Sequence, residues 1–333
     1  MRRNVTMADV AREAGVSVMT VSRVVNHKGE VSDTTRQRVQ EVIDRLGYSP
    51  STIARGLVTK RTGTLGLIVP DSANPFFSEV ARGAEHIAYA HGYNVFLCNT
   101  EESIERELDV LQLLKGKRVD GVLLCSSRLG SDMLQVALAS HPFAVLVNRG
   151  VENKSVGAVL VDDRLGGFIA TQHLLQTGHR AIGFLAGPPA SRSGRLRAEG
   201  YRHALAAASI PYLPDWVKSC SPVVAGGQAA AYELFSMNPE LDALFCFNDL
   251  VAVGALQACV SLNLAVPNDV AIVGTDDIPL AALVTPSLTT CHVSRYELGK
   301  QAMQLLLNRI EGCLEECQQI TLKPKLIIRE SAP

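Results

Sequence analysis

Two groups of side chains in this sequence have the chemistry to recognise other molecules. In the first, Ser22, Arg23 and Asn26 share one face of a predicted short helix. Arginine can donate two parallel hydrogen bonds to guanine in the DNA major groove, and Ser, Thr and Asn can bind phosphates or base edges. Val18 and Met19, at the start of the same helix, can contact thymine methyl groups. This face is suited to reading a DNA sequence.

The second group lies just past the ends of predicted strands. Asp, Asn and Arg side chains can bind sugar hydroxyls, and aromatic rings can cover the apolar faces of a sugar. The alternative for the two Phe residues is core packing at a helix start, and for the Asp it is a helix cap or turn. The candidate effector-binding residues are Asn74, Phe76, Phe77, Asn148, Arg149, Arg197, Asn248 and Asp276.

The first group is positioned by three predicted helices within the first 50 residues. Thr6 and Asp9 form a capping-box pattern at the start of the first helix, and Gly15 ends it. Ser17 can cap the second helix after a turn of only a few residues, which is the arrangement of a helix-turn-helix. Ser32 can cap a third helix. We therefore expect an all-α headpiece.

The second group is positioned by a repeated strand–helix pattern that begins near residue 65. Short apolar runs alternate with amphipathic stretches, which predicts parallel sheets with helices on both faces. Two such series predict two Rossmann-like lobes, with ligands bound at the carboxyl ends of the strands. The runs predicted to be buried strands are 65–69, 93–98, 121–125, 144–147, 159–161, 181–185, 243–247 and 270–273, with a last strand at 326–329.

The charge distribution separates the same two parts. Residues 1–61 carry eleven Lys or Arg and six Asp or Glu, a formal charge of +5, while the 333-residue chain as a whole has a charge of −1. A basic unit joined to an acidic one favours a nucleic-acid-binding head on a body that does not bind DNA. The eight Cys show no zinc-type spacing, so we expect no metal and no cofactor. No signal peptide and no 18-residue apolar run is apparent, which predicts a cytoplasmic protein without membrane contact.

Residues 6–11 (TMADVA), 14–17 (AGVS), 20–26 (TVSRVVN) and 46–50 (LGYSP) closely resemble the headpiece of the lac repressor–galactose repressor family. The resemblance implies that Val18, Met19 and Arg23 read bases. It also implies a hinge that orders on DNA and inserts a leucine into the minor groove, at Leu57. The residues that it places against the DNA backbone or in the hinge are Thr6, Ser17, Thr20, Ser22, Asn26, Ser32, Tyr48, Ser51 and Ala54.

Nearly all of residues 61–330 resemble the periplasmic sugar-binding fold that this family uses as its sensor, with a ribose-type arrangement of site residues. The expected domains are a headpiece (1–50), a hinge (51–62) and a two-lobed sensor (63–333). The first lobe comprises about 63–161 and 293–325, and the second about 162–292 and 326–333. The resemblance implies a dimer that binds a pseudo-palindromic operator.

Enzyme motifs are absent, since the sequence contains no phosphate-binding loop, no dinucleotide fingerprint after its first predicted strand and no nucleophile elbow. We therefore expect a DNA-binding regulator, with a small neutral sugar as effector. A purine or a phosphocarrier protein remains an alternative signal, because Pro222 and Val293 depart from the usual residues of sugar binders. Rival functions from other classes are an exported sugar-binding protein and a sugar-acting enzyme.

Overall fold

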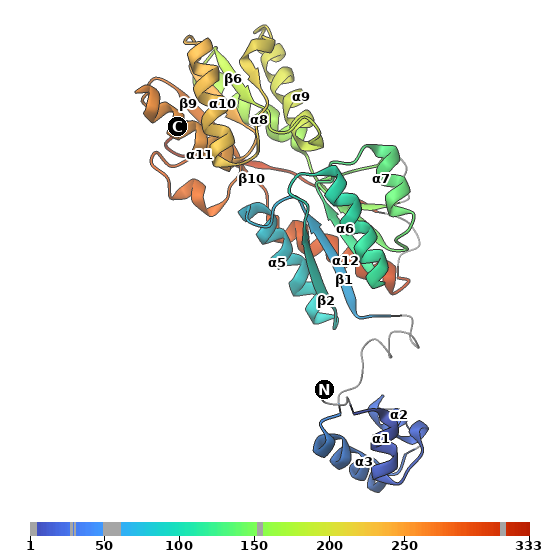
Figure 1. Ribbon diagram of the computed structural model, residues 1–333. Helices are drawn as coiled ribbons and strands as arrows, with labels where there is room; N and C mark the ends of the chain where they lie inside the picture. Colours follow the sequence, from blue (N-terminus) through green and yellow to red (C-terminus); the bar gives the residue numbers. More distant parts are fainter. Residues whose placement is uncertain (1–4, 27–28, 30, 49–60, 152–155, 314–317) are drawn as a thin grey trace. The chain divides into compact units, whose positions relative to one another are not determined.

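The computed structural model describes residues 5–26, 29, 31–48, 61–151, 156–313 and 318–333. The chain forms two compact units, Met1–Gly63 and Thr64–Pro333, which are described here separately (Figure 1). Among the described residues, no helix combines the length and apolar character needed to cross a membrane.

The smaller unit contains three helices with the predicted caps. They are α1 (Met7–Ala14), α2 (Val18–Val25) and α3 (Asp33–Leu46). The Thr6 hydroxyl accepts a hydrogen bond from the Asp9 amide, while the Asp9 carboxylate accepts one from the Thr6 amide, which completes the capping box. Gly15 ends α1 with a φ of 65°, a left-handed conformation that glycine adopts without strain.

The core of the smaller unit is made of small aliphatic side chains. Val10, Val21 and Val39, one from each helix, are each fully buried. They pack together with alanines from α1 and further aliphatic residues of α2 and α3. The inward face of each helix is therefore the apolar face that the sequence predicts.

The larger unit contains two six-stranded sheets with helices on both faces. In the first sheet the strand order is β11-β5-β4-β3-β1-β2, and all of its neighbouring strands are parallel. We call this sheet with its helices the first lobe. Its strands are β1 (Thr64–Val69), β2 (Asn94–Asn99), β3 (Gly121–Cys125), β4 (Ala144–Val147), β5 (Gly157–Val161) and β11 (Gln319–Leu322), and its helices are α5 (Pro75–Ala90), α6 (Ile104–Lys117), α7 (Ser131–Leu138) and α12 (Arg295–Ile310).

The second sheet has the order β12-β10-β9-β8-β6-β7, with β12 antiparallel to β10 and the other neighbours parallel. We call this sheet with its helices the second lobe. Its strands are β6 (Ile182–Leu185), β7 (Val217–Lys218), β8 (Ala243–Cys246), β9 (Ala271–Asp276), β10 (Thr289–His292) and β12 (Lys325–Ile327). Its helices are α8 (Asp163–Gln176), α9 (Arg192–Ala207), α10 (Val224–Met237) and α11 (Asp249–Leu262), with 3-10 turns at Pro214–Trp216 and Pro279–Ala282.

Helices cover both faces of each sheet, and side chains alternate along a strand, so successive residues of a central strand pack into different helix layers. In β1, Leu65, Leu67 and Val69 pack against α5 and α12, whereas Ile68 packs against the core under α6 and α7. Figure 1 shows the corresponding arrangement of helices around the strands. This burial on two faces explains why the sequence presents these strands as continuous apolar runs.

Pairs of helices cross closely at glycines. A Cβ atom at Gly83 of α5 would lie 2.1 Å from the main-chain oxygen of Tyr296, and one at Gly299 of α12 would lie 1.9 Å from that of Val80. Any side chain at either position would push the two helices apart. These glycines therefore set the distance between α5 and α12, and through it the position of the start of α5.

The structure corrects two expectations about strands. The segment 93–98 was expected to be buried, but β2 lies at the edge of its sheet, with Phe96 exposed at 46% and Leu97 at 51%. The sequence analysis also did not predict β10, because its residues are mostly polar. Thr289 and Thr290 are nevertheless fully buried, because their hydroxyls are hydrogen-bonded. The Thr289 hydroxyl donates to the main-chain oxygens of Arg329 and Ala332, and the Thr290 hydroxyl donates to the Asp249 carboxylate.

Candidate functional site

The recognition face of the smaller unit is formed by α2 and the turn before it. The Ser17 hydroxyl caps α2 by accepting a hydrogen bond of 3.1 Å from the Thr20 amide, and the two hydroxyls lie 2.9 Å apart. At the other end of the helix, the Asn26 side-chain amide donates to the main-chain oxygen of Ser22. These contacts fix the ends of an eight-residue helix whose outer face carries the predicted DNA-contacting residues.

Two apolar side chains stand out on this face. Val18 is exposed at 48% and Met19 at 66%, although the inner face of the same helix is fully packed. Adjacent exposed apolar groups at a helix start are costly in water and are suited to base methyl groups. Arg23, half-buried on the same helix, completes a face that combines apolar and cationic groups.

The remaining predicted DNA contacts are distributed over the smaller unit. Thr6 and Ser32 are exposed N-caps of α1 and α3, and Tyr48 is half-buried against the core of the unit. Capping hydroxyls at helix N-termini lie where a DNA phosphate can bind favourably. Ser51, Ala54 and Leu57 lie outside the described residues.

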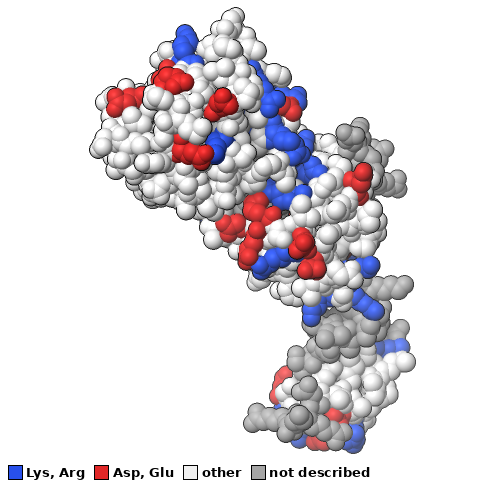
Figure 2. All heavy atoms as spheres, turned by 45° about the horizontal axis from the view of Figure 1, so that its top comes forward, with Lys and Arg blue, Asp and Glu red and all other residues white. Residues whose placement is uncertain are grey.

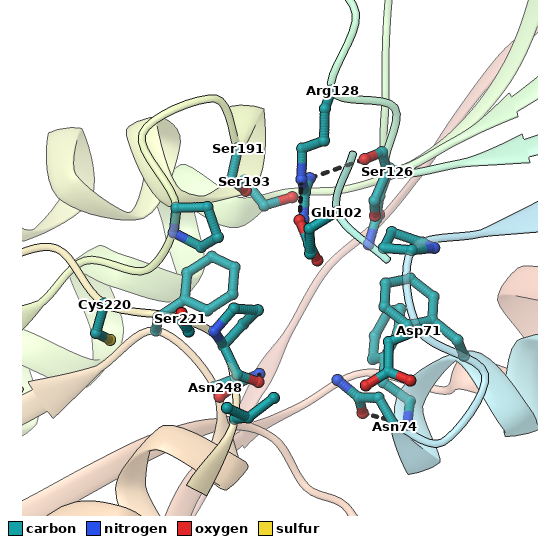
Figure 3. Close-up of a pocket in the computed structure, with 18 of the residues that line it drawn as sticks. Asp71, Asn74, Glu102, Ser126, Arg128, Ser191, Ser193, Cys220, Ser221 and Asn248 are labelled. Atoms are coloured by element: carbon teal, nitrogen blue, oxygen red, sulfur yellow. Dashed lines mark hydrogen bonds and ion pairs between the residues drawn. The ribbon is translucent and has the colours of Figure 1, made fainter. Parts of the chain in front are cut away.

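The larger unit contains a cavity of about 720 Å³ that is lined by both lobes (Figure 3). Its size is in the usual range for small-molecule sites. The structure brings seven of the eight predicted effector-binding residues to this cavity, namely Asn74, Phe76, Phe77, Asn148, Arg197, Asn248 and Asp276.

The wall from the second lobe is organised by Arg197, which is only 5% exposed. Its Nε donates to the Asp163 carboxylate at 2.9 Å, and a terminal nitrogen donates to the main-chain oxygen of Phe247. Another terminal nitrogen lies 3.8 Å from the carboxylate of Asp276. The Phe247 ring lies 5.1 Å from the guanidinium carbon, a cation–π distance. Arg197 is therefore held rigidly at the cavity wall.

Asp276 is a second ionisable group of this wall, and its pKa differs strongly from the ordinary value of an aspartate. Burial raises the pKa of its carboxyl to about 7, against an opposing effect of Arg197 and Arg295. A buried carboxylate with an elevated pKa in a cavity is a frequent feature of functional sites. Asp249, next to Asn248, is also buried, but its carboxylate binds the Thr290 hydroxyl and the Ile278 amide and does not line the cavity.

The wall from the first lobe comes from the start of α5 and the end of β3. Asn74 caps α5 by accepting a hydrogen bond from the Phe76 amide, and Phe76 and Phe77 meet edge to face at 5.1 Å. Both rings are at most 8% exposed, so they form part of the core as well as the cavity wall. Beside them, Arg128 binds the Glu102 carboxylate with two nitrogens, as Figure 3 shows.

Several of these residues have strained backbones. Ser126, Asn148 and Asp276, each at the carboxyl end of a strand, have φ values of 49°, 54° and 112°. Non-glycine residues rarely adopt such values, and they concentrate at functional sites where the surrounding structure holds them. The strain therefore supports the cavity, on both lobes, as the ligand-binding site.

Arg149 is the one predicted effector-binding residue that is not among the described lining residues of this cavity. Asn148 lines the effector cavity, whereas the next residue, Arg149, lines a second, separate one. A terminal nitrogen of Arg149 donates to the main-chain oxygen of Leu129 at 2.9 Å.

The sequence analysis also missed several cavity residues. They lie just after a strand, just before a helix or in the first turn of one, the place where parallel sheets bind ligands. Searching every strand end for polar side chains, and not only those with sugar-site resemblance, would have found them. They include Asp71, Glu101, Glu102, Ser126, Arg128, Ser191, Ser193 and Ser221.

Comparison with known families is consistent with both sites. Residues 6–51 match the family described as bacterial regulatory proteins, lacI family. Residues 62–330 match the family described as periplasmic binding proteins and sugar binding domain of LacI family. The two matches cover the recognition face and the cavity, respectively.

Individual proteins resemble the chain over nearly its whole length. The HTH-type transcriptional repressor PurR of Photobacterium profundum is 36% identical over 327 residues, which is 98% of each protein. The solved transcriptional regulator CelR–cellobiose complex is 35% identical, with a TM-score of 0.75, and the match covers 98% of this chain and 100% of that one. A lac repressor dimer, solved bound to operator and the anti-inducer ONPF, is 26% identical with a TM-score of 0.89, over 99% of each chain.

Proposed function

The chain belongs to the lacI family of bacterial regulatory proteins, and from this membership we propose that a neutral sugar, bound between the lobes, sets its affinity for operator DNA. It is a DNA-binding transcriptional repressor of the effector-modulated type. The observation that carries the sugar proposal is the cavity of about 720 Å³, whose polar groups converge from both lobes.

The charges of the cavity favour an uncharged ligand. Among the described residues, its lining has three carboxylates, Asp71, Glu101 and Glu102, together with the Asp276 carboxyl of elevated pKa, against two guanidinium groups, Arg128 and Arg197. Both guanidinium groups already lie against carboxylates within the structure. An anionic ligand would meet an excess of negative charge, whereas sugar hydroxyls can donate to carboxylates and accept from Asn and Ser side chains. A neutral polyhydroxyl compound therefore suits the lining better than a phosphorylated one.

A purine base is the second candidate for the effector. Relatives such as the Photobacterium profundum repressor bear the name PurR, and the cavity offers the rings of Phe76, Phe77 and Phe247. A planar base stacks on an aromatic face, and it is held most tightly between two parallel faces. Phe76 and Phe77 are inclined at 82° to each other, and Arg197 lies against Phe247. The geometry is therefore less favourable for a purine than for a sugar.

We propose residues 1–50 as the DNA-binding headpiece, 51–62 as the hinge and 63–333 as the effector-sensing domain, in a cytoplasmic dimer. A dimer would cover the apolar surface on the first lobe where Tyr89 of α5 is exposed at 77% and Phe96 and Leu97 of β2 at about half. A headpiece presents one recognition helix, so a palindromic operator requires two copies.

The experiment that tests the sugar proposal is thermal unfolding of the full chain against neutral sugars, sugar phosphates, nucleosides and purines. A ligand at about 100 times its dissociation constant should add about 2.7 kcal/mol to the free energy of unfolding. We expect stabilisation by a neutral mono- or disaccharide, cellobiose among those tested. Phe77→Ala should abolish the response, whereas the exposed Leu113→Ala of α6 should retain it. Stabilisation by a purine alone would reject the sugar and establish the second candidate.

A further inference from the structure

A second cavity, of about 430 Å³, lies between the two lobes and is separate from the effector cavity. Arg149 and Gln319 line it from the first lobe, and Arg192, Arg195 and Glu199 line it from the second lobe. The face of the larger unit in Figure 2 carries a band of Lys and Arg atoms across its middle. The function proposed above makes no use of this cavity.

The balance of charge in this cavity is opposite to that of the effector cavity. Among its described lining residues, three guanidinium groups stand against one carboxylate, that of Glu199. Glu199 is already bound by Arg164, whose Nε donates to it at 2.9 Å. Within the described part of the chain, neither Arg192 nor Arg195 has a carboxylate partner; Arg195 donates only to the main-chain oxygen of Pro189. The cavity therefore has positive charge that its described residues leave uncompensated.

Arg149 gives an independent indication of a ligand. The residue is only 7% exposed, yet its Nε has no hydrogen-bond partner in the described structure. Its one hydrogen bond there is from a terminal nitrogen to Leu129, although a guanidinium has five N–H donors. Burying a charged group with unmade hydrogen bonds costs stability. Burial, and then repulsion from Arg192 and Arg195, lowers the pKa of Arg149 against an opposing effect of Glu107.

The start of α9 adds to the positive potential. Arg192 and Arg195 lie in the first turn of this helix. That turn contains no acidic residue. A helix N-terminus carries a partial positive charge, so cations there are destabilising and anions stabilising. Two arginines at this position are unfavourable unless an anion binds beside them.

We propose that this second cavity binds the phosphate group of a small phosphorylated molecule, held by Arg149, Arg192 and Arg195. Guanidinium groups bind phosphate through paired, charge-assisted hydrogen bonds, and three of them converge here from both lobes. The volume of about 430 Å³ leaves room for a small organic group attached to the phosphate.

The two cavities share the segments that separate them. Asn148 and Ser191 line the effector cavity, while the residues that follow them, Arg149 and Arg192, line the second cavity. An anion that fixes Arg149 to Arg192 therefore fixes the two lobes relative to each other at the wall of the effector cavity. The phosphate is thus a second regulatory signal, which changes effector affinity by linkage.

The test is calorimetric titration of the full chain with inorganic phosphate, without sugar or DNA and at constant ionic strength. Wild type should bind with saturable heat, and Arg192→Gln should bind at least about tenfold more weakly, the loss expected from removing one charge-assisted contact. The matched control is Arg202→Gln, on the same helix but stacked on Tyr212 outside the cavity, which should bind phosphate as wild type does.

A second measurement separates binding from folding. Without phosphate, Arg192→Gln should unfold at the same temperature as wild type or higher, because the change removes repulsion at a helix N-terminus. The proposal is overturned if wild type gives no saturable response to phosphate, or if Arg192→Gln and Arg202→Gln bind it equally well. It is also overturned if Arg192→Gln loses binding only together with a lowered unfolding temperature.

Discussion

Replacing Asp276 by Asn should stabilise the empty protein while weakening its hold on the effector. The carboxyl group is 6% exposed at the cavity wall, 3.8 Å from the nearest nitrogen of Arg197. Burial raises its pKa from 3.8 to about 7, so the folded state favours the protonated form. Asparagine has the same shape and stays neutral at every pH.

The magnitude follows from the linkage between protonation and folding. Between about pH 4 and pH 7 the folded protein binds more protons at Asp276 than the unfolded chain does, so stability from this group is lost as pH rises through that range. The rise of the Asp276 pKa from 3.8 to about 7 lowers the free energy of unfolding by as much as about 4 kcal/mol above pH 7. Asp276→Asn should recover most of that at pH 8 and very little at pH 4.

The assay is urea unfolding of wild type and variant at pH 4, 6 and 8, with the exposed Asp215→Asn as control. The control should leave the pH dependence unchanged. In parallel, at pH 8, where the wild-type carboxyl is ionised, effector binding to Asp276→Asn should weaken by about 1.5–3 kcal/mol, the value for a hydrogen bond to a charged group. A variant that is less stable than wild type at pH 8, or that has the same pH dependence, would refute the assignment of a costly buried carboxylate.

Three further predictions concern the DNA site, the fold and the assembly. Arg23→Ala should lose about 1–3 kcal/mol of operator binding and relax specificity at one base pair in each half-site, measured by anisotropy against single-base operator variants; equal binding would contradict base reading. Gly299→Ala should destabilise the larger unit by about 1–3 kcal/mol in urea unfolding, because its Cβ would lie 1.9 Å from a main-chain oxygen of α5, and unchanged stability would contradict that contact. Sedimentation at micromolar concentration should give a dimer that Leu97→Lys dissociates, and a monomeric wild type would argue against the exposed β2 surface as an interface.

The strands that the sequence predicted well are those buried on both faces. β3 and β4 appear at their expected residues because a parallel strand between two helix layers must be apolar throughout. The same rule misled at β2, since Phe96 and Leu97 are apolar yet lie exposed at the sheet edge. An apolar run alone does not distinguish a buried strand from an exposed edge strand.

The candidate sites were predictable to different extents for physical reasons. The headpiece depends on local signals, such as the Thr6 cap and Gly15, which act within a few residues. The effector cavity depends on the strand ends of two sheets, where neighbouring residues in the sequence can line different cavities. Asn148 lines the effector cavity and Arg149 lines the second one, and nothing local in the sequence distinguishes them.

The central claim is that a neutral sugar in the effector cavity changes operator affinity. The most direct measurement is fluorescence anisotropy of a selected palindromic operator with the full chain, with and without the sugar that stabilises it. We predict a shift of roughly 5- to 150-fold in operator affinity, the usual range of allosteric coupling, and no shift in Phe77→Ala. An operator affinity that stays the same at saturating sugar, or that shifts equally in Phe77→Ala, would contradict the claim.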